Sequence, residues 1–253
     1  MRKYFILLGM ILLFFNFVGA QELTGDQIIE KVNEIMNQKT VHATMKMTIV
    51  TTSGKERTFE YESWSKDSGE KNLVRYMKPS RIKGQAILML NNADDIWSFF
   101  PRTKRVRKLA THAKKQKMQG SDFTYEDMGS GDTFINNFTA KRSDEKKFED
   151  KDCFVLELTK KKEADSHYSR LIMYVLKENF IPIVVDYFHE DDPTRNTKRL
   201  VQSDIREIDG VPTGMRMVMT NKEDNTQTKM EILKCEYNVP LDDNMFTERE
   251  LKK

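Results

Sequence analysis

The densest group of chemically capable side chains in this 253-residue sequence lies between positions 94 and 132. It begins with an aromatic run over residues 96–100 and continues with a basic segment, residues 102–117, that holds no acidic residue. It ends in an acidic and aromatic motif, GSDFTYED, over residues 120–127. Such cations, carboxylates and rings can bind an anionic surface, fix a loop or contact an apolar ligand.

Residues that would support catalysis are not arranged for it. His42, His112, His167 and His189 show no zinc-protease spacing, and the sequence has neither a Gly-x-Ser-x-Gly elbow nor a phosphate-binding glycine loop. The acidic run after His189 offers ligands for a hard cation, but its place before Pro193 between two strands is more typical of a charged turn. We therefore predict no enzyme, no metal site and no cofactor, and a hydrolase is the least favoured function.

The N-terminus is typical of a secretory signal. Arg2 and Lys3 precede an apolar run over residues 4–18, and small residues end at Ala20. The run is short for a bilayer span, which needs about 20 apolar residues. We expect residues 1–20 to be a signal peptide that is cleaved after Ala20, and residues 21–253 to form a single domain outside the cytoplasm.

Charge argues against nucleic acid as a partner. The whole sequence has 42 Lys and Arg against 39 Asp and Glu, and removal of the signal leaves 40 against 39. A nearly neutral chain does not attract a polyanion, so its basic character is local.

The rest of the sequence predicts a strongly curved antiparallel sheet with few helices, an α+β fold. Thr24 and Gln27 have the spacing of a capping box, followed by apolar residues at helical spacing up to about Gln38. A second, short helix is expected over residues 121–128. In the stretches between turn residues, apolar and polar residues alternate with a period of two, which predicts an antiparallel meander of strands. Its strands are expected at residues 41–49, 56–64, 72–77, 85–90, 96–100, 153–158, 171–176, 181–188, 197–208, 215–219 and 228–237.

Four segments of this sequence resemble the LolA-like outer-membrane lipoprotein-sorting family. They are PSRIKGQAIL at residues 79–88, WSFFP with RVRK at 97–101 and 105–108, the motif at 120–127, and YN, PLDD and FT between residues 237 and 247. The motif at 120–127 is the most specific of the four.

The resemblance implies an open, unclosed β-barrel around an apolar cavity with helices as its lid. It also implies a monomeric periplasmic carrier or chaperone that binds lipoprotein acyl chains or another lipid for transfer toward the outer membrane. An inner-membrane transporter and an outer-membrane acceptor would then be its partners. The best-known members have an arginine that locks the lid. Arg57, Arg75, Arg81 and Arg107 are the candidates for it here, and whether one of them has this role stays open.

Methionine stripes suit such a cavity because flexible thioether side chains adapt to chains of varying shape. Each buried methylene contributes roughly 0.8 kcal/mol, so an acyl chain needs no specific polar contact. Ordinary core packing is the alternative for every one of these residues. The candidates for the cavity wall are Met45, Met47, Leu88, Leu90, Trp97, Phe99, Phe123, Met215, Met217 and Met219.

Two further sites are expected beside the cavity. The acidic motif serves either as a lid, in which its aromatic rings cover the cavity, or as a structural clasp, in which its acidic side chains hold the loop. The candidate residues for the lid or clasp are Ser121, Asp122, Phe123, Tyr125, Glu126 and Asp127. A basic handle would contact an anionic membrane, a head group or an acidic partner, unless it only keeps a hairpin soluble. It comprises Arg102, Lys104, Arg105, Arg107 and Lys108. A secreted adaptor that docks a transporter through this handle, without cargo, is the alternative function. Whether Cys153 and Cys235 pair stays open.

Overall fold

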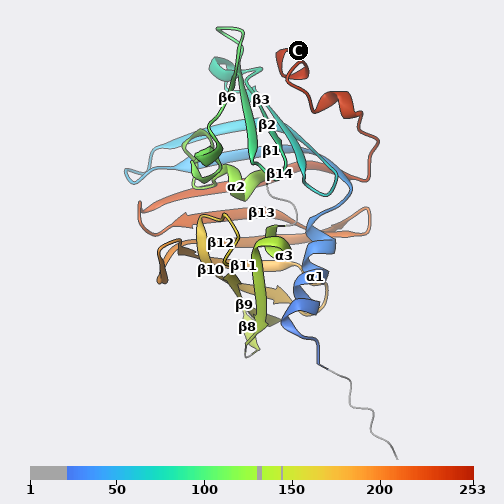
Figure 1. Ribbon diagram of the computed structural model, residues 1–253, viewed down its shortest axis with the longest axis vertical. Coiled ribbons are helices and arrows are strands. Elements are labelled where there is room, and N and C mark those ends of the chain that lie inside the picture. Colours follow the sequence, from blue (N-terminus) through green and yellow to red (C-terminus); the bar gives the residue numbers. More distant parts are fainter. Residues whose placement is uncertain (1–21, 130–132, 144) are drawn as a thin grey trace, which may run out of the picture.

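The computed structural model describes residues 22–129, 133–143 and 145–253, and the expected signal peptide lies outside them. The described residues form one 14-stranded antiparallel sheet in the order β6-β5-β4-β3-β2-β1-β14-β13-β12-β11-β10-β9-β7, with β8 on β9 (Figure 1). The strands are β1 (Thr40–Val50), β2 (Glu56–Lys66), β3 (Lys71–Lys78), β4 (Ala86–Leu90), β5 (Asp95–Phe100), β6 (Arg105–Lys108), β7 (Phe138–Arg142), β8 (Lys146–Phe148), β9 (Lys151–Lys160), β10 (Tyr168–Leu176), β11 (Pro182–His189), β12 (Asp192–Ile208), β13 (Val211–Asn221) and β14 (Thr226–Tyr237).

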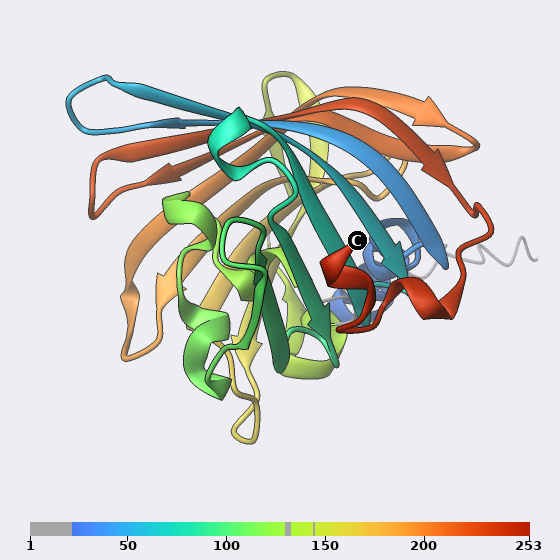
Figure 2. The ribbon, with the colours of Figure 1, turned by 90° about the horizontal axis from the view of Figure 1, so that it is seen from above.

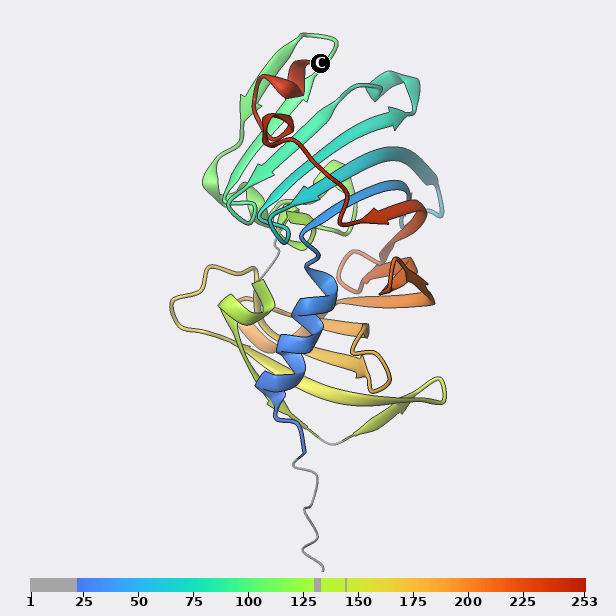
Figure 3. The ribbon, with the colours of Figure 1, turned by 90° about the vertical axis from the view of Figure 1, so that its right-hand side faces the viewer.

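The sheet is strongly curved and open. Its two ends are β6 and β7, and the described part of the chain shows no pairing between them. Figures 2 and 3 show the strands wrapping around a common interior. The halves of the chain meet in the middle of the sheet, where β1 pairs with β14 from Val41 opposite Tyr237 to Val50 opposite Gln227. The predicted curved antiparallel sheet is confirmed.

Alternation along the strands builds a main core inside the curve and two smaller apolar clusters, one of which includes Cys153, Leu176 and Ile183. Ile87, Met89 and Ile96 belong to the main core inside the curve, together with Met47 and Tyr61. The intervening residues of β4 and β5 face outward and pack beneath the C-terminal segment, which includes η4 (Asp243–Met245) and η5 (Glu250–Lys252). The outer core comprises Leu73, Ala86, Leu88, Phe99, Phe246 and Leu251.

Helix α1 (Gly25–Met36) begins at the predicted capping box. The Thr24 N–H donates to Gln27 Oε1 at 2.9 Å, and the Gln27 N–H donates to Thr24 Oγ1 at 3.2 Å. Its buried apolar residues include Ile28 and Val32. The helix runs alongside the half of the sheet that ends at β7 and contacts β7 and α3 (Thr133–Asn137) (Figure 3).

One segment connects the two ends of the sheet. Between β6 and β7 the chain passes through η2 (Thr111–Lys115), η3 (Met118–Gly120), α2 (Tyr125–Gly129) and α3 (Figure 1). The expected helix over residues 121–128 is therefore shorter and begins only at Tyr125. Strands β7 and β8 and helix α3 were not predicted, because their short polar sequences carry no clear period. No helix among the described residues is long and apolar enough to cross a membrane.

We expect Gly25→Ala to destabilise the protein although alanine is the better helix former. A Cβ there would lie 2.5 Å from the Ala140 carbonyl oxygen and 2.7 Å from the Arg142 nitrogen, both backbone atoms of β7. Overpacking of this kind costs about 1–3 kcal/mol. Urea unfolding measures the loss, with exposed Glu30→Ala on the same helix as the control, for which we expect a change within about 0.5 kcal/mol. An unchanged midpoint for Gly25→Ala would contradict the tight contact between α1 and β7.

Candidate functional site

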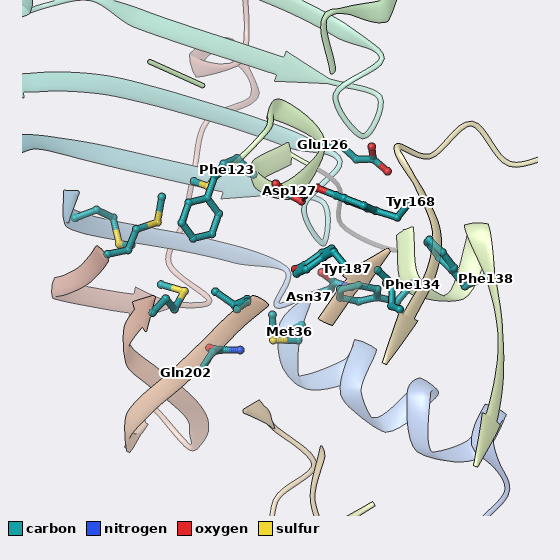
Figure 4. A pocket seen from close by; sticks show the side chains of 16 residues that line it. Met36, Asn37, Phe123, Glu126, Asp127, Phe134, Phe138, Tyr168, Tyr187 and Gln202 are labelled. Atoms are coloured by element: carbon teal, nitrogen blue, oxygen red, sulfur yellow. Dashed lines mark hydrogen bonds between the residues drawn. The ribbon is translucent and has the colours of Figure 1, made fainter. Parts of the chain in front are cut away.

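An apolar pocket of about 200 Å³ lies inside the curve of the sheet (Figure 4). Its walls come from α1, α2 and α3, from β1 and from strands of the half of the sheet that ends at β7. The lining residues are Met36, Asn37, Met45, Phe123, Glu126, Asp127, Met128, Phe134, Phe138, Tyr168, Leu171, Tyr187, Leu200, Gln202, Met217 and Met230.

Methionines contribute most to the adaptable part of this lining. Met45, Met217 and Met230 come from three adjacent strands, β1, β13 and β14, while Met36 and Met128 come from α1 and α2. Met217 lies directly opposite Met230 in the sheet. Five thioether side chains around one pocket form an adaptable wall, in which the Met230 sulfur accepts a hydrogen bond from the buried Tyr61 hydroxyl at 3.8 Å.

The residues predicted for the cavity wall separate into three groups. Met45, Met217 and Phe123 line the pocket. Met47 and Met219 are fully buried in the main core but do not line the pocket. Met215, on the same strand as Met219, is half-buried. The other four lie in the outer core on the opposite face of the sheet, which corrects their assignment to the pocket: Leu88, Leu90, Trp97 and Phe99. Their strands turn the alternate residues, Ile87, Met89 and Ile96, toward the interior.

A buried ion pair fixes the acidic motif over the pocket. The Lys198 ammonium on β12 donates to Asp127 Oδ2 at 2.8 Å, and the side chains of the two residues are 7% and 4% exposed. Asp127 also accepts from the Tyr168 hydroxyl at 2.8 Å and from the Thr124 N–H at 2.7 Å. The ammonium lies 4.9 Å from the Tyr168 ring centroid and 5.3 Å from that of Tyr187. Buried charges need such partners to be tolerated.

The other two acids of the motif are fixed in the same manner. Asp122 accepts from the hydroxyls of Thr226 at 2.6 Å and Thr228 at 2.8 Å, both on β14. Glu126 accepts from the Ser166 hydroxyl at 2.6 Å and from the His167 N–H at 2.9 Å. The three carboxylates therefore bind three separate parts of the sheet's far half.

The neighbouring acids have opposite pKa shifts. Burial acts to raise the pKa of Asp127, but the charge and hydrogen bond of Lys198, with the Thr124 and Tyr168 donors, lower it below the usual value. Burial raises the pKa of Glu126, and its bonds to Ser166 and His167 compensate only in part.

The uncharged residues of the motif point elsewhere. Phe123 is 4% exposed and projects into the pocket (Figure 4), while the buried Tyr125 bonds to Ser98 of β5. Ser121 does not cap α2; its hydroxyl accepts from the Phe123 N–H. Thr124 takes the capping role, because its Oγ1 accepts from the Asp127 N–H at 3.1 Å. Thr124 and Asp127 thus form a reciprocal capping pair, and the same Asp127 carboxylate accepts from Lys198.

The basic segment divides into two parts. Lys114, Lys115 and Lys117 are paired with acids, Lys114 with Asp94 at 2.7 Å for example. The five residues of the basic handle lie on the β5–β6 hairpin, where Lys108 pairs with Asp95 at 2.6 Å and lies over the Trp97 ring. Among the described residues, the other four have no acidic partner: Arg102, Lys104, Arg105 and Arg107.

The acidic turn, the two cysteines and the four arginines are the candidates that remain. Glu190, in the acidic turn after His189, pairs with Lys115 at 2.8 Å, and no cluster of three or more metal-ligating side chains occurs among the residues that the structure describes. Cys153 and Cys235 are free thiols. Of the four arginines considered for lid locking, Arg57 reaches the motif, where its guanidinium donates to the Gly120 carbonyl at 3.4 Å.

Sequence reasoning missed Lys198, Tyr168 and Tyr187. Lys198 and Asp127 are 71 positions apart, so no local pattern links them. One signal was present: Lys198 shares the parity of Leu200 and Gln202, both of which line the pocket. A lysine at an inward position of a strand requires a buried anion.

We expect Lys198→Met to destabilise the protein by about 3–5 kcal/mol, because it leaves the Asp127 charge buried without its partner. The double variant Lys198→Met/Asp127→Asn should recover part of this loss. Denaturant unfolding measures both. The matched control is Lys147→Met, whose pair with Asp152 is about two-thirds exposed on each side and should change stability by less than about 1 kcal/mol. Equal effects at the two lysines would contradict the role of the buried pair.

The ion pair also predicts a pH dependence. The pKa of Asp127 is lower in the folded protein than the ordinary value of 3.8, so its stabilisation is complete above that value and is lost as the pH falls through the folded pKa. The difference in unfolding free energy between the wild type and Asp127→Asn should therefore be constant near neutral pH and shrink below about pH 4. A difference that stays constant down to pH 2.5 would contradict this assignment.

Known proteins of the same fold were found by structural comparison. One is a domain from Vibrio parahaemolyticus that is assigned to outer membrane lipoprotein sorting. Its TM-score is 0.81 at 24% identity, and the match covers 90% of this chain and 98% of the Vibrio chain. A DUF1329 family protein from Desulfovibrio piger also gives 0.81 at 24% identity, with coverages of 90% and 97%. A LolA superfamily protein from Nitrosomonas europaea gives 0.75 at 22% identity, with coverages of 90% and 100%.

Sequence comparison finds one matching family model. No curated protein matches. A family model with the description "Uncharacterized protein"-like matches residues 68–253, which include the acidic motif, the basic handle and most of the pocket. The chain belongs to the family that this model describes, and it shares its fold with the LolA superfamily protein from Nitrosomonas europaea.

Proposed function

We propose that the protein is a periplasmic carrier or chaperone that binds the acyl chains of a lipoprotein, or another lipid, in the methionine-lined pocket. The observation that carries the proposal is this pocket, closed on one side by a motif whose acids bind the sheet and whose Phe123 ring enters the cavity. An apolar, adaptable wall suits ligands that differ in chain length. The LolA-like fold supports the same role.

The size of the pocket indicates that it must widen to take up cargo. Its volume of about 200 Å³ lies below the roughly 300–1,000 Å³ of typical ligand sites. Phe123 fills part of the interior, and Met36 and Met128 separate the pocket from a second one of similar volume beside Gly129. Rotation of methionine side chains costs little, so we propose that these two residues and Phe123 move when a chain enters.

The proposal includes a location and a set of partners. Cleavage after Ala20 would release the domain into the periplasm, as a monomer without catalytic activity. Donor and acceptor proteins at the inner and outer membranes would then load and unload it. Each methylene that a cargo chain buries contributes roughly 0.8 kcal/mol, so release requires a competing apolar site in the acceptor.

The direct test is native mass spectrometry of the mature protein, purified from cells without detergent, for co-purifying lipid. A fluorescent fatty-acid probe then measures affinity. We expect Met217→Glu to weaken probe binding at least tenfold, because it places a charge in the apolar pocket. The control is Met215→Glu, two residues along the same strand and outside the pocket lining, which should bind as the wild type does.

Two outcomes would oppose the carrier. Equal losses in Met217→Glu and Met215→Glu would show that the probe does not enter this pocket. A protein that is purified empty and also fails to bind the probe would favour the adaptor, since the hairpin cations without acidic partners among the described residues offer a docking surface.

A further inference from the structure

A second pocket, outside the apolar one, is formed by two turns that lie side by side. One turn contains η1 (Ser80–Ile82), and the other connects β5 to β6. The pocket has a volume of about 430 Å³. Its lining residues are Arg81, Ile82, Gln85, Phe100, Pro101, Arg102, Thr103 and Arg107.

The two turns are held by their own backbone bonds. The Gln85 N–H donates to the Ile82 carbonyl at 2.8 Å, and the Lys104 N–H donates to the Pro101 carbonyl at 3.3 Å. Gly84, with φ of +80°, lies beside Pro101, and an added Cβ there would be in ordinary van der Waals contact with the proline Cβ at 3.8 Å. The three arginines of the pocket are therefore placed by ordered backbone.

The charge of this pocket is uncompensated. Arg81, Arg102 and Arg107 line it without any acidic residue, and within the described residues none of them has an ion-pair partner. The Arg107 guanidinium lies 5.8 Å from the Phe100 ring centroid. Elsewhere in the basic segment, by contrast, Lys108, Lys114, Lys115 and Lys117 all have acids.

We propose that this arginine pocket (Arg81, Arg102, Arg107, with Gln85) binds a phosphate group. Guanidinium groups form paired hydrogen bonds to phosphate oxygens. The positive charge of three such groups also matches a phosphate better than it matches a carboxylate, which carries only one negative charge. The volume leaves room for a group attached to the phosphate, which Ile82, Phe100 and Pro101 would contact. Lys104, Arg105 and Lys108 lie outside the pocket lining and do not belong to this site. The assignment does not depend on the proposed lipid cargo.

The test titrates the full mature protein with inorganic phosphate and with glycerol 3-phosphate, observing the arginine Nε–H signals by NMR. We expect shifts at the pocket arginines, and a loss of affinity of at least tenfold in Arg81→Gln/Arg107→Gln. The control is Lys104→Gln/Arg105→Gln, which removes the same charge from the same region and should change affinity less than threefold. Thermal unfolding verifies that both variants fold.

Flotation with phosphatidylglycerol and phosphatidylcholine vesicles distinguishes the sources of the phosphate. Binding to phosphatidylglycerol that the pocket variant loses and the control keeps assigns the site to a lipid head group. Binding of the soluble probes alone assigns it to a free phosphate compound. The proposal is overturned if neither type of probe binds, or if the pocket and control variants lose binding equally, since that result indicates only diffuse attraction.

Discussion

The architecture depends on a single segment that crosses between the two ends of an open sheet. Because β6 and β7 are the two ends of the sheet, residues 109–137 must pass from one end to the other. The buried pair of Asp127 and Lys198 attaches the middle of that path to β12. Asp122 and Glu126 add attachments to β14 and to the loop before β10. The position of α2 and Phe123, and with it one wall of the apolar pocket, follows from these contacts.

The two proposed sites have opposite physical characters and are formed by different parts of the chain. The apolar pocket is lined by residues from β1 and from the half of the sheet that ends at β7, where burial makes any unpaired charge costly. The arginine pocket lies near the free end at β6, where exposed guanidinium groups remain hydrated until an anion binds. Separation lets each site change without disturbing the other.

Much of the fold was predictable because the strands alternate clearly. The pattern from Val41 to Ile49 identified β1 and its inward methionines, and Thr24 with Gln27 identified the start of α1. Alternation alone does not reveal which parity faces inward when both faces are apolar. Residues 86–90 are apolar throughout, and Leu88 was therefore assigned to the wrong side. The contacts of Asp127 and Glu126 depend on residues about 40 or more positions away, which only the folded chain brings together.

The pairing of β1 with β14 has a consequence for the order in which the protein is made. Nearly 200 residues separate Val41 from Tyr237, so the central seam of the sheet cannot form until synthesis is almost complete. A hairpin such as β2–β3 can form early, but the two halves of the sheet stay unjoined. An unfinished chain thus remains loosely organised and easily unravelled. If the chain is exported as proposed, that delay would help, because a polypeptide must be threaded through a narrow translocation pore before it folds.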